Sequence, residues 1–161
     1  MFRIEEPAKQ FCEVLGKKMA YSELGSGPPV VLLHGNPASS YIWRNIMPHA
    51  APQARCIAPD LIGMGDSEKL EGTDPDRYGF LQHRRFVDGL LEKLNVTNDI
   101  VLVGHDWGGA RAMDWARLFP LESSQVAMDF GSIPSTRGSP DAYVHSWGKF
   151  LPGCKPEAPK R

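Results

Sequence analysis

The sequence predicts an α/β protein with a mostly parallel sheet covered by helices on both faces. Short apolar runs alternate along the chain with longer segments in which apolar residues recur at helical spacing. Two of the apolar runs, residues 30–33 and 100–103, lead directly into turns that contain glycine. Because strand–helix–strand units produce parallel strands with helices on the sheet faces, this order favours one layered α/β core.

The first half of the chain supplies an antiparallel opening and the start of the alternation. Predicted strands at 11–14 and 18–24 are joined near Gly16, and a turn rich in Gly and Pro follows at 25–29. After this turn we expect, in order, a strand at 30–33, a helix from about Ser40 to Ala50 and a strand at 56–58.

The second half of the chain opens with a polar loop at 65–77. Apolar side chains then recur at helical spacing through residues 80–94, which predicts an amphipathic helix with a buried stripe. The stripe consists of Phe86, Val87, Leu90, Leu91 and Leu94. A strand at 99–103, a helix to about Leu118 and a strand at 125–129 complete the pattern.

The most informative motif is Gly104-His105-Asp106-Trp107-Gly108, between an apolar strand and a predicted helix. A strand, a tight turn and a helix in this order form a nucleophile elbow, in which small residues let strand and helix approach closely. Asp106 occupies the exposed tip of the turn. Its carboxylate is anionic at neutral pH and attacks an sp³ carbon without a base to activate it. The alternative is a structural aspartate that caps the following helix.

A second loop complements the elbow. The strand at 30–33 runs into His34-Gly35-Asn36-Pro37. In enzymes with a nucleophile elbow, the corresponding loop donates backbone N–H groups to the oxyanion hole, beside the residue that follows the nucleophile. Asn36 adds a side-chain amide with two further donors.

Three motifs together resemble the haloalkane dehalogenases and the related coelenterazine-using luciferases, which are α/β-hydrolases. The motifs run from His34 to His49, from Arg55 to Ser67 and from Gly104 to Gly109, and the similarity covers roughly residues 15–130. The resemblance implies that Asp106 displaces a halide to form an alkyl-enzyme ester. It also implies that the Trp107 indole N–H and the Asn36 amide hold the leaving halide, whose charge two preorganised donors would stabilise in a dry pocket.

Hydrolysis of that ester requires a histidine oriented by a third carboxylate. Asp129 is the candidate carboxylate, at a strand end where the similar dehalogenases and luciferases carry Glu; the alternative is a strand-end Asp bonded to backbone. The only histidine after Asp129 is His145, which stands in sequence unlike the family and which we interpret as a surface or loop residue. We therefore expect the catalytic histidine to be missing from this chain.

The other histidines have plainer interpretations. His34 and His105 are expected to be buried, with a ring N–H bonded to backbone, whereas His49 and His83 are expected to face solvent. Residues 63–67 contain a Gly-x-Gly without the further Gly or Lys of a phosphate-binding loop, so we expect a tight turn there.

Members of the resembled family are considerably longer than this chain, with a helical cap and further strands downstream. We therefore expect residues 1–131 to form a partial α/β-hydrolase core that lacks the cap and the last strands. Residues 132–161, rich in Pro, Gly and Ser, are unassigned and expected to be a disordered tail. A truncated gene model, a splice product and a non-catalytic remnant all remain open. The exposed edge of the last strand favours self-association.

Composition excludes several functions. Eighteen basic and nineteen acidic side chains give a formal charge of −1, which provides no electrostatic basis for binding nucleic acid or an anionic membrane. Neither a signal sequence nor a transmembrane run is visible, so we expect a cytoplasmic protein. Cys12, Cys56 and Cys154 are too widely spaced for a metal site, and no metal or cofactor is expected. Two of them are interpreted as packing residues and Cys154 as a tail thiol.

Other functions share these motifs. An epoxide hydrolase also uses the sequence from Gly104 to Gly109, although that family more often has an aromatic residue where Asn36 stands. A luciferase-like monooxygenase would share nearly every motif. A non-catalytic binding or regulatory fragment that retains the halide site belongs to a different class. For the enzyme, we expect a small, apolar, halogenated or related substrate.

Overall fold

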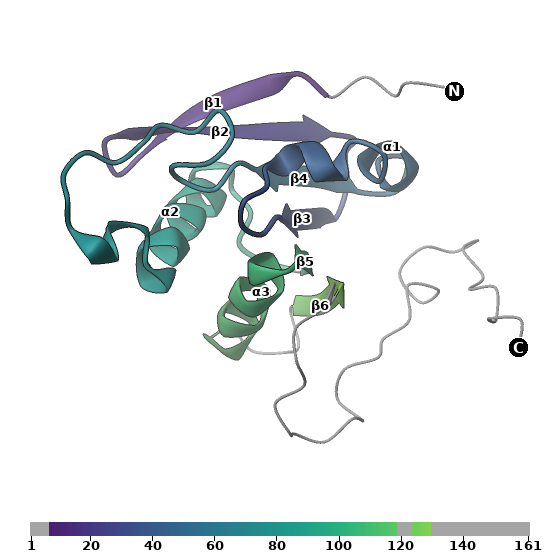
Figure 1. Cartoon of the computed structure of the whole chain (residues 1–161). Coiled ribbons are helices and arrows are strands. Elements are labelled where there is room, and N and C mark those ends of the chain that lie inside the picture. The colour runs from purple at the N-terminus through teal and green to yellow at the C-terminus, as the bar shows by residue number, and fades with distance from the viewer. Residues whose placement is uncertain (1–6, 119–123, 130–161) are drawn as a thin grey trace, which may run out of the picture. The chain divides into compact units, whose positions relative to one another are not determined.

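In residues 7–118 and 124–129, which the computed structural model describes, six strands form one sheet in the order β1-β2-β4-β3-β5-β6 (Figure 1). All of these residues belong to the compact unit Met1–Gly131. The strands are β1 (Lys9–Val14), β2 (Lys17–Leu24), β3 (Pro29–Leu33), β4 (Arg55–Pro59), β5 (Ile100–His105) and β6 (Ser124–Asp129).

The sheet is mixed, with its parallel part around β3. This strand pairs in parallel with both β4 and β5, and β5 pairs in parallel with β6. Strands β1 and β2 form an antiparallel hairpin, which joins the rest of the sheet through the antiparallel pairing of β2 with β4. Because Leu33 pairs with Gly104, the loops that follow β3 and β5 leave the sheet side by side. The predicted α/β fold with mostly parallel strands is confirmed.

Helices α2 (Phe80–Lys93) and α3 (Trp107–Leu118) pack on one face of the sheet. The cluster that joins them to the strands includes Val31, Leu33, Ile57, Ile100 and Leu102 of the sheet, Phe86, Val87, Leu90 and Leu91 of α2, and Ala112 and Trp115 of α3. The opposite face meets α1 (Met47–Ala50), which lies close to β4 (Figure 1). Successive side chains of a strand point to opposite faces, so Cys56 faces away from the cluster that contains Ile57. Cys56 Sγ lies 4.0 Å from the carbonyl oxygen of Met47 in α1.

Two local predictions are wrong in detail. The single helix expected from Ser40 to Ala50 is instead a 3₁₀ helix, η1 (Ser40–Trp43), followed by the separate short helix α1. Pro48 lies in the first turn of α1, and its missing N–H favours a new helix start over continuation. The polar loop expected at 65–77 contains the start of a second 3₁₀ helix, η2 (Pro75–Tyr78), which Asp74 caps.

The structure also corrects the interpretation of His83. Its side chain is only 1% exposed, because His83 lies one turn before Phe86 and Val87 on the buried stripe of α2. His49 is exposed and Cys56 is buried, as predicted, and Cys12 packs partly against the core. The expected tail, residues 132–161, lies outside the described residues, together with His145 and Cys154.

Candidate active site

The turn after β5 holds Asp106 in a rarely populated backbone conformation. Its φ is 53°, in the left-handed region that non-glycine residues seldom adopt and that is often found at functional sites. Glycines let the strand and helix approach closely: a Cβ on Gly104 would lie 2.5 Å from the Gly109 Cα, and one on Gly108 would lie 2.0 Å from the Leu33 carbonyl oxygen. This is the geometry of a nucleophile elbow.

Two backbone N–H groups, one from each neighbouring loop, bind the Asp106 carboxylate. The Asn36 N–H donates to Oδ2 over 3.1 Å, and the Trp107 N–H also donates to the carboxylate. The hydrogen bond from Trp107 is the largest cause of a lowered pKa for Asp106; partial burial opposes it and the Asn36 bond adds to it. The carboxylate is therefore ionised at neutral pH. The predicted convergence of the two loops is found in the structure.

His34 and Gly35 bring the first loop to Asp106. A Cβ on Gly35 would lie 2.3 Å from Asp106 Oδ2, so only glycine permits this approach. His34 is fully buried; its Nδ1 lies 2.7 Å from the Gly35 carbonyl oxygen, and its Nε2 accepts the Leu61 N–H at 2.9 Å. Since Nε2 accepts, Nδ1 carries the proton and the ring is neutral, and burial lowers the pKa in the same sense. His34 is a structural histidine, as predicted.

A buried ion pair fixes the far end of the same loop. The fully buried Asp60, just after β4, accepts hydrogen bonds from Lys9 Nζ at 2.9 Å, from the Ser40 N–H at 2.8 Å and from the Asp66 N–H at 2.9 Å. Burial alone would raise the pKa of Asp60, but these donors lower it below its ordinary value. Lys9 Nζ also binds Ser40 Oγ. The loop between β3 and η1, which carries Asn36, is thus held at both ends.

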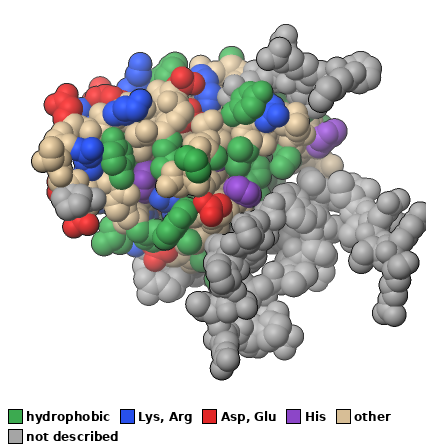
Figure 2. Space-filling view, in the orientation of Figure 1, with side chains coloured by type: hydrophobic (Ala, Val, Ile, Leu, Met, Phe, Trp, Pro, Cys, Tyr) green, Lys and Arg blue, Asp and Glu red, His purple; other side chains and the backbone are tan. Residues whose placement is uncertain are grey.

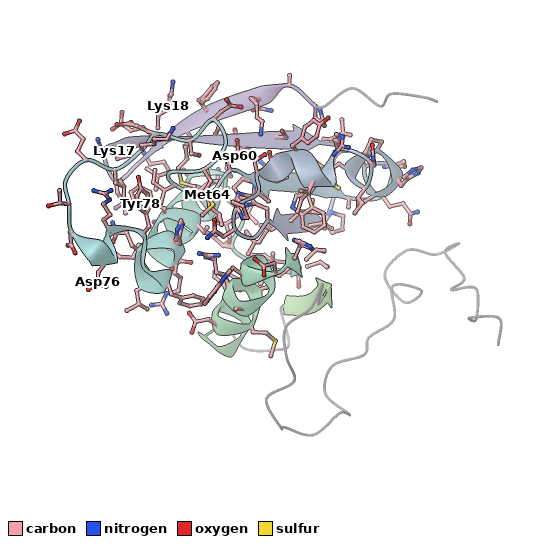
Figure 3. The ribbon with its side chains drawn as sticks, in the orientation of Figure 1. Lys17, Lys18, Asp60, Met64, Asp76 and Tyr78 are labelled. Carbon is pink, nitrogen blue, oxygen red and sulfur yellow. The ribbon has the colours of Figure 1, made fainter. Side chains whose placement is uncertain are left out.

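Residues 63–67 form the expected tight turn around Asp60 (Figure 3). A Cβ on Gly65 would lie 2.3 Å from Asp60 Oδ2, and Ser67 Oγ donates to the Asp60 carbonyl oxygen at 2.6 Å. The carboxylate fills the position that an anion would need. This turn is therefore structural and does not bind phosphate.

The side chains of Asn36 and Trp107 are both exposed, the indole by 53%. In this structure their backbone N–H groups bind Asp106. The halide-binding role of the two side chains stays a prediction.

Asp129 ends β6 opposite His105, the last residue of β5. The backbone register therefore places Asp129 on the strand next to the one that carries Asp106 at its end. This placement is compatible with the acid role proposed from the sequence, and that role stays a prediction. His105 is half-buried, and its Nδ1 has no hydrogen-bond partner among the described residues, so the backbone bond expected for its ring is not found at that atom.

Sequence reasoning missed Arg111, a charged residue in the buried stripe of α3. Its side chain is 8% exposed, and its Cζ lies 5.8 Å from the centre of the Phe80 ring of α2. Burial lowers its pKa to about 10, and Asp106 opposes that change. The available signal was its spacing: Arg111 stands three residues after Gly108 and four before the buried Trp115, which is the spacing of one helix face.

In the part of the chain that the structure describes, no cluster of three or more His, Cys, Asp or Glu side chains is arranged to hold a metal ion. No helix in the same part is long and apolar enough to cross a membrane. Acidic and basic side chains are interspersed over the face shown in Figure 2.

Known proteins with similar sequences include haloalkane dehalogenases. The family model of the alpha/beta hydrolase fold matches residues 28–150. A haloalkane dehalogenase of Sphingobium indicum is 54% identical over 109 residues, covering 68% of this chain and 37% of that protein. One from Mycolicibacterium smegmatis is 41% identical over 133 residues, covering 78% of this chain and 43% of that protein. The chain thus spans less than half the length of these relatives.

Solved structures agree with the sequence comparison. A crystal structure of DBJA is 45% identical, with a TM-score of 0.69, over 76% of this chain and 40% of that one. The haloalkane dehalogenase DbeA from Bradyrhizobium elkani is 42% identical, with a TM-score of 0.68, over 75% of this chain and 40% of that one. The chain belongs to the α/β-hydrolase fold family and resembles the haloalkane dehalogenases within it.

Proposed function

We propose that Asp106 is the nucleophile of a haloalkane-dehalogenase-type reaction. One observation carries this proposal: a carboxylate stands at the tip of an elbow, and two backbone N–H groups from separate loops bind it. An ionised carboxylate attacks carbon without a general base, which a serine at this position would need. The relatives with this sequence pattern are haloalkane dehalogenases, which favours small halogenated compounds as substrates.

In the first step, a carboxylate oxygen of Asp106 attacks the carbon that bears the halogen. The carbon–oxygen bond forms as the carbon–halogen bond breaks, and the halide leaves with the bonding electron pair. The product is an alkyl ester of Asp106. The Trp107 indole and the Asn36 amide are the proposed donors to the halide, because the backbone N–H of each of these residues binds the Asp106 carboxylate.

In the second step, water would attack the carbonyl carbon of the ester. The negative charge would then develop on an oxygen of the former carboxylate, within reach of the Asn36 and Trp107 N–H groups. Activation of that water requires a base, and Asp129 is the proposed acid that would orient one. The single histidine beyond Asp129 in the sequence is His145, which we do not assign as the base. We therefore propose that the 161-residue chain forms the ester and hydrolyses it slowly.

The proposed setting is the cytoplasm, with a small apolar halogenated compound as the substrate.

Among the described residues, β6 has β5 as its one neighbour in the sheet, so its free edge is the proposed surface for self-association. The luciferase-like, epoxide-hydrolase and non-catalytic alternatives predict no stoichiometric release of halide.

Bromide release tests the proposal. The purified chain is mixed with an excess of 1-bromobutane, and free bromide is measured over time. We expect a burst of about one bromide per chain, followed by a slow phase limited by hydrolysis of the ester. Without a base, this hydrolysis lacks the roughly 10²–10⁴-fold acceleration that general-base catalysis supplies. Asp106→Asn should abolish the burst, while Asp66→Asn, which changes an exposed aspartate of the loop after β4, should preserve it. A burst that survives in Asp106→Asn would refute the proposal.

A further inference from the structure

Arg111 is a buried cation without an ion-pair partner of its own among the described residues. Its Nε and Nη1 are buried and donate no hydrogen bond to any atom in that part of the chain. Arg84 of α2 instead forms an ion pair with Asp114 of α3, with 3.0 Å between Nη1 and Oδ2. Burying a guanidinium without compensation is costly, so a balancing negative charge is expected nearby.

The charged and titratable groups around Arg111 come from four elements. Asp106, at the start of α3, interacts electrostatically with Arg111, and His105 of β5 interacts with Asp106. His34, in the loop after β3, and His83 of α2 also interact with Arg111. Burial lowers the pKa of both of these histidines, to about 4 for His83, so both are neutral at pH 7. The Asp106 carboxylate is the negative charge in this set.

We propose that Arg111 is a positioning residue for the nucleophile, whose buried guanidinium balances the charge of the Asp106 carboxylate in the free protein and that of the halide once the ester has formed. The geometry supports this role, because Arg111 follows Asp106 by little more than one turn of α3 and is held inside the protein against the Phe80 ring. Ester formation neutralises Asp106, and the released halide now carries that negative charge. A fixed cation therefore favours binding of the halide in the site. This second part rests on the proposed function; the first does not.

The test titrates Asp106 directly. Carboxyl-¹³C aspartate is incorporated into the full chain, and the Asp106 signal is assigned by its absence in Asp106→Asn. Its titration midpoint is then compared in the unaltered chain, Arg111→Met, Arg111→Lys and Arg85→Met. Arg85 is exposed on the neighbouring helix α2, so Arg85→Met deletes one positive charge at a position that faces solvent.

We expect Arg111→Met to raise the midpoint of Asp106, and Arg111→Lys and Arg85→Met to leave it near that of the unaltered chain. An unchanged midpoint in Arg111→Met would overturn the proposal, as would an equal rise in Arg111→Lys, since shape rather than charge would then matter. Arg111→Gln provides a second neutral variant, and loss of the folded state in both neutral variants would assign Arg111 a structural role instead. Because this readout needs no alkylation, it is independent of the bromide burst.

Discussion

Replacing Lys9 by Met isolates the buried ion pair that fixes the loop beside the nucleophile. Lys9 Nζ lies 2.9 Å from Asp60 Oδ2, with side-chain exposures of 16% and 0%. Removing one partner of a buried pair costs about 3–5 kcal/mol. Asp60 keeps the N–H donors of Ser40 and Asp66, so we expect the lower end of that range, about 3 kcal/mol at pH 7.

Urea unfolding of the two chains measures this change, with a matched control on the same hairpin. Lys17→Met removes the same charge from an exposed ion pair with Glu68, whose side chains are 27% and 40% exposed. Exposed pairs contribute little to stability, so the control should lose far less stability than Lys9→Met. Equal losses in Lys9→Met and Lys17→Met would refute the assignment of Asp60 as a buried, stabilising centre.

The pH dependence of the same difference gives a second check. The pKa of Asp60 is lowered in the folded protein, so its contribution is present above the unfolded-state pKa and is lost as the pH falls through the folded-state value. The stability difference between the unaltered chain and Lys9→Met should therefore shrink in acid. A difference that stays constant down to pH 2 would mean that the lysine stabilises by packing alone.

Three further predictions follow from the site and its surroundings. Gly108→Ala places a Cβ 2.0 Å from the Leu33 carbonyl oxygen, so it should lower the free energy of unfolding in urea by about 1–3 kcal/mol and reduce the bromide burst. Arg111→Met should raise the melting temperature, because burial of the guanidinium outweighs its attraction to Asp106 and leaves the pKa of Arg111 lowered to about 10; a lower melting temperature would mean that Asp106 compensates the buried charge in full. Because the pKa of His83 is lowered from 6.5 to about 4, stability should fall as the pH drops through that window. His83→Leu should reduce the loss between pH 7 and pH 4.5 by about 2–3 kcal/mol in the same assay, and an unchanged loss counts against burial of this ring.

The elbow could be predicted from the sequence because its causes are local. Glycines at fixed distances from Asp106, between an apolar run and a helical stripe, leave few other backbone conformations. The approach of the Asn36 loop was predicted from the loop arrangement of enzymes with a nucleophile elbow, and the pairing of Leu33 with Gly104 provides this arrangement.

The remaining features depend on distant or atypical residues. Lys9 and Asp60 are 51 residues apart, and nothing local in either segment indicates that they meet. His83 and Arg111 are polar residues at positions of a buried helix stripe. The residue type of His83 favoured a solvent-facing interpretation that tertiary packing overrides, and Arg111 was not singled out from the sequence. The break between η1 and α1 depended on Pro48, which a search for apolar spacing does not weigh.

Peptide mapping after reaction with 1-bromobutane tests directly whether Asp106 is the nucleophile. The chain is incubated with the reagent, digested, and analysed by mass spectrometry for a butyl group on each peptide. We expect one butyl group per chain, located on Asp106, and none in Asp106→Asn. A butyl group on a cysteine or histidine, with Asp106 unmodified, would contradict the assignment of Asp106 as the nucleophile.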